Sequence, residues 1–175
     1  MDSTRVAHPA SNVESTVGAF HFVAFGTPKA AGSKRGFVLP GTKRVIITDD
    51  NPKSRPWKNQ VAQAAGLAMD GRQLFNGPLS VEMRFMVARP KGHFGKNGLN
   101  ATGRASPYPA KKPDALKLAR GVEDAMSGVV YRDDAQIVHE VLTKEYGEPE
   151  RVEVTMTELD GSPVLPPSRH YAVGF

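Results

Sequence analysis

The segment 78–88 restricts the possible folds of this chain more than any other. Its apolar residues alternate with mostly polar ones, a period of two that is typical of a strand with one buried face. The apolar set is Leu79, Val81, Met83, Phe85 and Val87, and the set between them is Ser80, Glu82, Arg84 and Met86. The segment therefore predicts a half-buried strand within a sheet that other elements cover on one side.

Other segments have the composition of strands. Residues 19–25 are rich in aromatic and β-branched side chains and end at a Gly-Thr-Pro turn. Residues 36–40 and 44–50 are separated by a short loop that contains Gly, which predicts a hairpin. Residues 129–146 predict a strand or a strand pair, and residues 151–159 alternate as a last strand.

Two segments have helical periodicity. After Pro56, apolar residues recur at helical spacing as far as Gly71. Pro113 and Asp114 predict the start of a second helix, which ends near Ser127. On a helical wheel, the apolar residues of this second helix form one arc: Ala115, Leu118, Ala119, Val122, Ala125 and Met126. The order of strands and helices predicts an α+β fold, in which a single compact domain has a mixed β-sheet and two main helices.

The length of the chain, 175 residues, fits one domain. We expect a flexible segment at 1–18, the domain at 19–159 and an irregular tail at 160–175. Inside the domain, residues 90–113 are rich in Gly, Pro, Asn and Lys, which predicts a long, basic and mobile loop. The absence of Cys excludes disulfides and thiolate zinc sites and fits a reducing, cytoplasmic location. The absence of a signal-peptide-like stretch and of a long apolar run predicts a soluble protein.

Positive charge is concentrated in two parts of a chain whose formal net charge is +5. Residues 28–58 hold eight basic residues against two acids, and residues 84–113 hold seven basic residues and no acid. This distribution favours a surface that binds a polyanion such as DNA, although an ordinary solvated surface has the same composition. The candidates for DNA binding are Lys29, Lys34, Arg35, Arg89, Lys91, Lys96, Arg104, Lys111 and Lys112.

Carboxylates are concentrated in the next part of the chain. Residues 114–134 hold five of them, at Asp114, Glu123, Asp124, Asp133 and Asp134. Mg²⁺ binds one or two carboxylates together with waters and phosphate oxygens. Asp114 at a helix start, with Asp133 and Asp134 near the start of the following strand segment, therefore predicts a Mg²⁺ site. Structural roles are the alternative: Asp114 can cap the helix, Asp124 can pair with Arg120, and Asp133-Asp134 can form a turn.

Three short motifs follow one another over residues 111–147. Lys112-Pro113-Asp114 begins the second helix, Asp124-Ala125-Met126 ends it, and Asp133-Asp134-Ala135-Gln136-Ile137 comes after it. In this order they resemble the RusA-like Holliday junction resolvases, whose pattern is a Lys-Pro-Asp-x-Asp-Asn-Leu-x-Lys helix start, an Asp-Ala-Leu helix end and a late Asp-Asp-x-Gln-Ile. Supporting cues at 26–29, 77–79 and 89–91 extend the resemblance to about residues 20–158.

The resemblance implies a homodimer that binds branched DNA and resolves four-way (Holliday) junctions by paired symmetric nicks, in DNA recombination and repair. It also implies an Mg²⁺ or Mn²⁺ cofactor and a bacterial or phage-infected cell. Carried over to this chain, it makes Asp114, Asp133 and Asp134 the catalytic metal ligands, with Asp134 in direct contact with the metal. Lys117 and Arg120 would then hold the scissile phosphate.

The chain departs from this pattern at the helix start. Leu116 stands where the pattern has its second Asp, Lys117 where it has Asn, and Arg120 where it has Lys. Glu123 shares the angular position of Leu116 but lies about 10 Å further along the helix, so Glu123 and Asp124 are accessory acids at most. The loss at Leu116 leaves two other hypotheses open: a catalytically impaired junction-binding protein of the same fold, and a general basic architectural DNA-binding protein.

Overall fold

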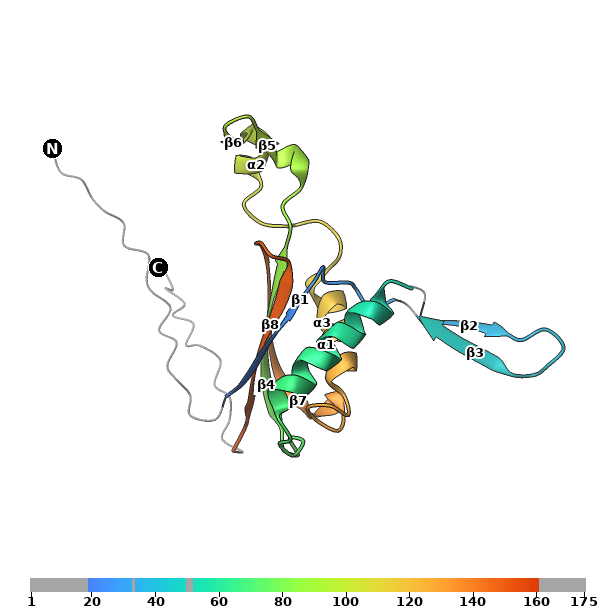
Figure 1. Ribbon diagram of the computed structural model, residues 1–175. Helices are drawn as coiled ribbons and strands as arrows, with labels where there is room; N and C mark the ends of the chain where they lie inside the picture. Colours follow the sequence, from blue (N-terminus) through green and yellow to red (C-terminus); the bar gives the residue numbers. More distant parts are fainter. Residues whose placement is uncertain (1–18, 33, 50–51, 161–175) are drawn as a thin grey trace, which may run out of the picture.

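The computed structural model describes residues 19–32, 34–49 and 52–160, and its centre is a four-stranded sheet in the order β1-β8-β4-β7 (Figure 1). The strands are β1 (Phe20–Phe25), β4 (Leu79–Val87), β7 (Ile137–Tyr146) and β8 (Arg151–Glu158). β8 pairs antiparallel with both β1 and β4, whereas β7 runs parallel to β4. The sheet is therefore mixed, and the predicted α+β class is confirmed.

Two long helices cover one face of this sheet (Figure 1). They are α1 (Ser54–Met69) and α3 (Ala115–Met126), and they contact each other. Every fourth residue of α1 from Trp57 is buried. The buried residues of α3 follow the predicted apolar arc with two differences: Ala115 is only half-buried, and Gly121 is buried outside the arc. α1 packs on β1, and α3 packs on β4 and β7. Among the alternating residues of β4, Leu79, Met83 and Phe85 are completely buried in the shared core. The helical layer and the sheet thus share one apolar core.

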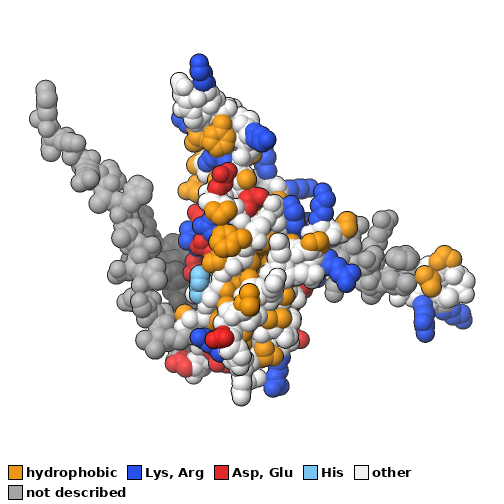
Figure 2. Space-filling model, viewed as in Figure 1, with side chains coloured by type: hydrophobic (Ala, Val, Ile, Leu, Met, Phe, Trp, Pro, Cys, Tyr) orange, Lys and Arg blue, Asp and Glu red, His pale blue; other side chains and the backbone are white. Residues whose placement is uncertain are grey.

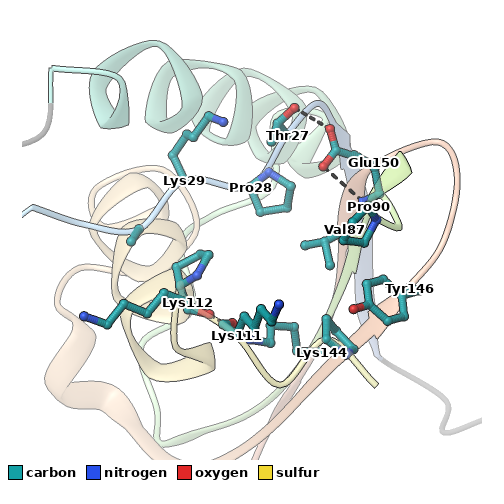
Figure 3. A pocket seen from close by; sticks show the side chains of 14 residues that line it. Thr27, Pro28, Lys29, Val87, Pro90, Lys111, Lys112, Lys144, Tyr146 and Glu150 are labelled. Carbon is teal, nitrogen blue, oxygen red and sulfur yellow. Dashed lines mark hydrogen bonds between the residues drawn. The ribbon is translucent and has the colours of Figure 1, made fainter. Parts of the chain in front are cut away.

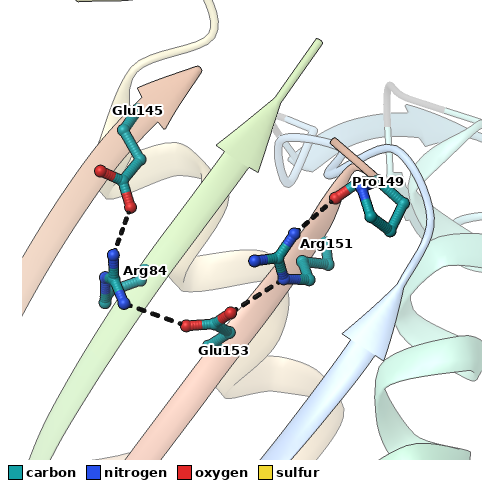
Figure 4. A network of polar contacts seen from close by, with 5 residues as sticks. All are labelled: Arg84, Glu145, Pro149, Arg151 and Glu153. Carbon is teal, nitrogen blue, oxygen red and sulfur yellow. Dashed lines mark hydrogen bonds and ion pairs between the residues drawn. The ribbon is translucent and has the colours of Figure 1, made fainter. Parts of the chain in front are cut away.

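The opposite face of the sheet carries ion pairs between neighbouring strands (Figure 4). Arg84 of β4 lies 2.6 Å from Glu145 of β7 and 3.2 Å from Glu153 of β8. Arg151 donates to Glu153 at 2.8 Å and to the carbonyl oxygen of Pro149 at 2.9 Å. Ion pairs on a protein surface each contribute less than about 1 kcal/mol, so the core on the helical side contributes most of the stability of the sheet.

Two smaller units project from this body (Figure 1). One is the predicted hairpin, formed by β2 (Lys34–Val38) and β3 (Val45–Asp49). The other lies between β4 and α3 and consists of η1 (Lys91–His93), β5 (Phe94–Gly95), β6 (Gly98–Leu99) and α2 (Ala101–Ala105).

The second unit, residues 91–105, is held by hydrogen bonds from side chains. Asn100 caps α2 by accepting from the Gly103 amide at 2.9 Å, and it donates to the Gly92 carbonyl at 2.8 Å. Arg89 donates to the carbonyls of Gly103 at 3.0 Å and Ser106 at 2.8 Å. The absence of regular structure expected over 90–113 is therefore wrong for 91–105, because such local bonds specify turns without any apolar period. The mobility of this unit stays a prediction.

The other predicted elements agree with the observed ones, with one correction. Residues 128–136 are not part of a strand: they form a turn followed by the short 3-10 helix η2 (Asp134–Gln136), and β7 begins only at Ile137. The segments predicted for the two ends, 1–18 and the tail from residue 161, lie outside the described residues. Within the part that is described, no helix has the length and apolarity needed to cross a membrane.

Candidate active site

Asp114 lies immediately before α3, with an extended backbone (φ −70°, ψ 147°). Although this is a capping position, its side chain makes no capping hydrogen bond. The carboxylate is 57% exposed, and Lys117 Nζ lies 3.6 Å from its Oδ2. The alternative explanation of Asp114 as a helix cap is therefore wrong, and its oxygens remain accessible to a cation.

Asp133, by contrast, has a structural role. Its Oδ1 accepts from the Ala135 amide at 2.9 Å, and Gln136 Oε1 accepts in return from the Asp133 amide at 3.2 Å, which is a capping box for η2. Gln136 also donates to the carbonyls of Phe75 at 3.0 Å and Gly77 at 3.1 Å. The turn proposed as the alternative for Asp133 is thus confirmed, and it ties this motif to the residues that precede β4.

A cluster of carboxylates lies between the second half of α3 and the start of β7. Glu123 of α3 interacts with Glu140 of β7 and, over a longer range, with Asp134 and Asp124. Burial, the hydrogen bond with Glu140 and the repulsion from these three carboxylates raise the pKa of Glu123 to about 8. Oε1 of Glu140 is buried and has no hydrogen-bond partner among the described residues. At neutral pH the Glu123 carboxyl therefore holds a proton.

Glu140 is absent from the residues predicted from sequence because of a β-bulge. Leu79 pairs with Ile137, but the next residue, Ser80, pairs with His139, so β7 contains one extra residue at this point. Simple alternation from Ile137 would direct His139 to the core side and Glu140 away from it. The extra residue reverses this order, because side chains of a strand alternate with a period of two. Only the strand pairing reveals that Glu140 faces α3.

The carboxylate cluster predicts a pH dependence of stability. The pKa of Glu123 is about 8 in the folded protein against an ordinary value of 4.5. Between these values the folded state holds a proton that the unfolded state has released, so the free energy of unfolding falls as the pH rises. A Glu123→Gln variant keeps the size of the side chain without its charge. We expect it to be more stable than the wild type above about pH 8 and to lose most of this slope.

Urea unfolding over a series of pH values, in EDTA so that no cation enters the cluster, measures the effect. The matched control is Glu82→Gln, since Glu82 is exposed on the opposite face of the sheet. A Glu123→Gln profile that runs parallel to the wild-type profile would contradict the assigned pKa.

The remaining candidates lie along the exposed side of α3. Leu116 is 68% exposed, and Lys117 and Arg120 are also exposed. The ion pair that Asp124 forms is with Lys58 of α1, at 2.7 Å, and it links the two helices; the predicted partner was Arg120. Leu116 therefore leaves an apolar gap between Asp114 and Arg120 on a surface that is otherwise charged.

The structure does not gather the predicted metal ligands into one preformed site. Asp134 lies near Glu123, in the second half of α3, whereas Asp114 precedes the helix, about 13 Å from Glu123 on an ideal helix. Across the described residues, no three His, Cys, Asp or Glu side chains are arranged to hold a metal ion. Carboxylates are nevertheless the ligands that Mg²⁺ prefers, and one or two suffice when phosphate oxygens and waters complete the coordination. The residues present therefore fit a metal that binds together with its substrate.

The predicted DNA-binding residues lie in several places. Lys91, Lys96 and Arg104 are exposed on the projecting unit 91–105, and Figure 2 shows Lys and Arg side chains on this unit and between it and the β2–β3 hairpin. The side chains of Lys34 and Arg35 are outside what the structure describes.

Three further candidates, Lys29, Lys111 and Lys112, line a cavity beside the start of α3 (Figure 3). Arg89 has an internal role as well, because its guanidinium lies over the ring of Tyr146 at 4.0 Å from the centroid. This contact and its bonds to Gly103 and Ser106 anchor the projecting unit to the sheet beside the cavity.

Similarity to known proteins covers most of the chain, including Asp114, the carboxylate cluster and the residues around the cavity. A Bacillus subtilis (strain 168) protein, described as uncharacterized protein YqaN, is 30% identical over 139 residues, which are 79% of this chain and 95% of that protein. Residues 27–157 match the family described as endodeoxyribonuclease RusA. The chain therefore belongs to the RusA family of endodeoxyribonucleases.

Proposed function

We propose that this protein is a structure-specific endonuclease that uses Mg²⁺ or Mn²⁺ to nick four-way DNA junctions symmetrically. The observation that carries the proposal is Asp114, whose carboxylate stands at a helix start, makes no capping bond and is 57% exposed. Family membership supports DNA as the substrate. The exposed side chains of Lys111 and Lys112, before α3, and of Lys117, on it, support binding to the phosphate backbone.

Asp114 and Asp134, which are not gathered into one preformed site, would each hold a metal together with phosphate oxygens and waters. Asp133 would position Asp134 through the capped turn of η2. When bound, the metal would supply a water of lowered pKa and neutralise charge on the phosphate. Lys117 and Arg120, which are exposed on the same helix, would bind the non-bridging oxygens of the scissile phosphate and stabilise the charge that develops there.

Symmetric nicks require two sites, because one chain supplies only one set of these acids. A homodimer related by a twofold axis would present two equivalent sites to two opposed strands. The sheet face opposite the helices is available for such contacts, since it carries the exposed apolar side chains of Phe25 and Val141 beside the Arg84 ion pairs. We therefore propose the homodimer as the active form.

A second candidate is a junction-binding protein that cleaves poorly or not at all. The observation that favours it is Leu116, an apolar side chain that is 68% exposed at the position where the resemblance places a second Asp. This candidate predicts salt-sensitive binding of branched DNA without metal-dependent nicking.

The test is a cleavage assay of the purified protein on a synthetic four-way junction, with Mg²⁺, Mn²⁺ or EDTA. We expect paired nicks at symmetric positions on the junction, only with a divalent metal, and none on matched duplex or single-stranded DNA. Tight junction binding with no nicks under any metal would favour the second candidate. Equal affinity for junction and duplex would contradict both and leave a general basic DNA-binding protein.

A further inference from the structure

A cavity of about 380 Å³ lies beside the proposed catalytic residues. Its walls come from four parts of the chain: the residues after β1, the end of β4, the segment that leads to α3, and the end of β7 with the turn before β8 (Figure 3). Pro113 is one of its lining residues, so the cavity is immediately next to Asp114. Sites for small molecules typically measure about 300–1,000 Å³, and this volume suits a single small aromatic group better than a duplex.

The lining combines apolar walls with a few polar groups. Pro28, Val87, Pro90 and Pro109 supply flat or branched apolar surface. Figure 3 shows the hydroxyl of Tyr146 directed into the cavity. The amines of Lys29 and Lys112 lie at its rim, pointing away from its centre (Figure 3). Apolar walls, a hydrogen-bonding edge and cations at the mouth match the three parts of a nucleotide, namely the base faces, the base edge and the phosphate.

Glu150 is the acceptor in this lining, and it is held in place. One of its oxygens accepts from the Thr27 hydroxyl, and the other accepts from the Ala88 amide at 3.1 Å. A carboxylate has about four acceptor positions, so these two bonds leave further lone pairs for a ligand. The opposite wall is also fixed, because Lys144 Nζ donates to the carbonyls of Lys111 and Pro113, both at 2.8 Å. The cavity is therefore formed before any ligand binds.

We propose that this cavity, the nucleotide pocket, binds one unpaired nucleotide of a branched DNA strand next to the phosphate that is cut. The base lies between the apolar walls with its amino group donating to Glu150, while Lys29 and Lys112 hold the flanking phosphate. A base within a duplex is stacked and paired, so it reaches such a cavity only by leaving the stack, which costs least where pairing is already disturbed. A branch point meets this condition. The proposal rests on the proposed function and adds which nucleotide of the branched substrate the protein recognises.

The pocket also implies a base preference. Cytosine, adenine and guanine each carry an amino group that can donate to the Glu150 carboxylate. Thymine has no amino group, and its single ring donor is flanked by two carbonyl oxygens that the carboxylate repels. We expect an amino-bearing base at the branch point to be favoured over thymine by about three- to tenfold in affinity, which is the contribution of one hydrogen bond.

The experiment uses the whole protein and four-way junctions that differ only in the nucleotide at the branch point, in EDTA so that binding is measured without cleavage. In one series that nucleotide is 2-aminopurine, whose fluorescence rises when the base leaves the stack. In the other it is cytosine or thymine, and the two junctions compete for the protein. We expect a fluorescence rise on binding and a preference for cytosine.

Two variants and one control test whether the fluorescence rise and the base preference arise in the nucleotide pocket. Glu150→Gln should reduce the preference for cytosine to less than about twofold, because the acceptor loses its charge. Ala88→Leu, at an exposed position of the lining, should abolish the fluorescence rise by filling the pocket. The control is Glu148→Gln, an exposed residue of the same turn outside the pocket, which should behave as the wild type.

The outcomes separate this proposal from the function on which it rests. A wild type that binds the junction tightly, with no fluorescence rise and no base preference, would overturn the pocket alone. A wild type that binds no branched DNA would overturn the proposed function and the pocket with it. If Glu150→Gln does not fold, the response of Ala88→Leu still decides, and an undiminished fluorescence rise in that variant would overturn the pocket.

Discussion

An Asp114→Asn variant is expected to lose metal-dependent nicking of a four-way junction by about a thousandfold and to bind the junction as the wild type does. Asn keeps the shape of the side chain but carries no charge, so it is a much weaker ligand for Mg²⁺. The folded state should tolerate the change, because the carboxylate makes no capping bond and its contact with Lys117, at 3.6 Å, is an exposed pair. The measurement is single-turnover nicking with Mg²⁺, beside an equilibrium binding assay in EDTA.

The matched control is Asp70→Asn. Asp70 ends α1 in the left-handed conformation (φ 45°), which Asn adopts readily, and it is exposed. It should nick at the wild-type rate. An Asp134→Asn variant should resemble Asp114→Asn if each of these residues holds a metal that the reaction needs. If the double variant Asp114→Asn, Asp134→Asn nicks the junction at the wild-type rate, neither residue is a catalytic metal ligand.

A Leu116→Asp variant is expected to nick junctions about ten- to hundredfold faster than the wild type. One more carboxylate near the metal would strengthen metal binding and lower the activation free energy of nicking by about 1.4–2.7 kcal/mol. Leu116 is 68% exposed, so its replacement leaves no cavity. The position also lies in the first turn of α3, where a negative charge interacts favourably with the helix dipole. The variant should therefore be at least as stable as the wild type, which a thermal melt verifies.

Two controls separate metal binding from a general effect of charge. Leu67→Asp changes another leucine, 75% exposed on the surface of α1, and should leave the nicking rate unchanged. Leu116→Asn introduces polarity without charge and should not accelerate nicking. Equal rates for Leu116→Asp and the wild type would mean that the metal, if bound, does not approach this turn of α3.

Together these variants distinguish the two candidate functions. If the wild type nicks and Asp114→Asn does not, the nuclease needs no carboxylate at position 116. If the wild type only binds and Leu116→Asp nicks, the chain is a junction-binding protein that one substitution returns to catalysis. In either case the nucleotide pocket beside Pro113 can be tested separately, because its readouts depend on binding alone.

Apolar periodicity in the sequence was enough to determine most of the fold. The alternation over 78–88 and the apolar arc of 114–127 predicted β4 and α3, since burial of a regular face leaves a regular pattern. The order of the Asp-containing motifs predicted the family, which the match over residues 27–157 confirms. The unit 91–105 escaped prediction because its turns depend on single hydrogen bonds from Asn100 and Arg89.

The pairing of β4 also shows what only the tertiary structure decided. Leu79 and Ser80 of β4 pair with residues of β7 that are separated by one extra position, and this bulge turns Glu140 toward Glu123. The cavity lined by Thr27, Lys111 and Glu150 likewise joins parts of the chain that are far apart in sequence. Periodicity describes which face of one element is buried. It carries no information on register or on which distant segments meet, and these set the chemistry of the carboxylate cluster and the pocket.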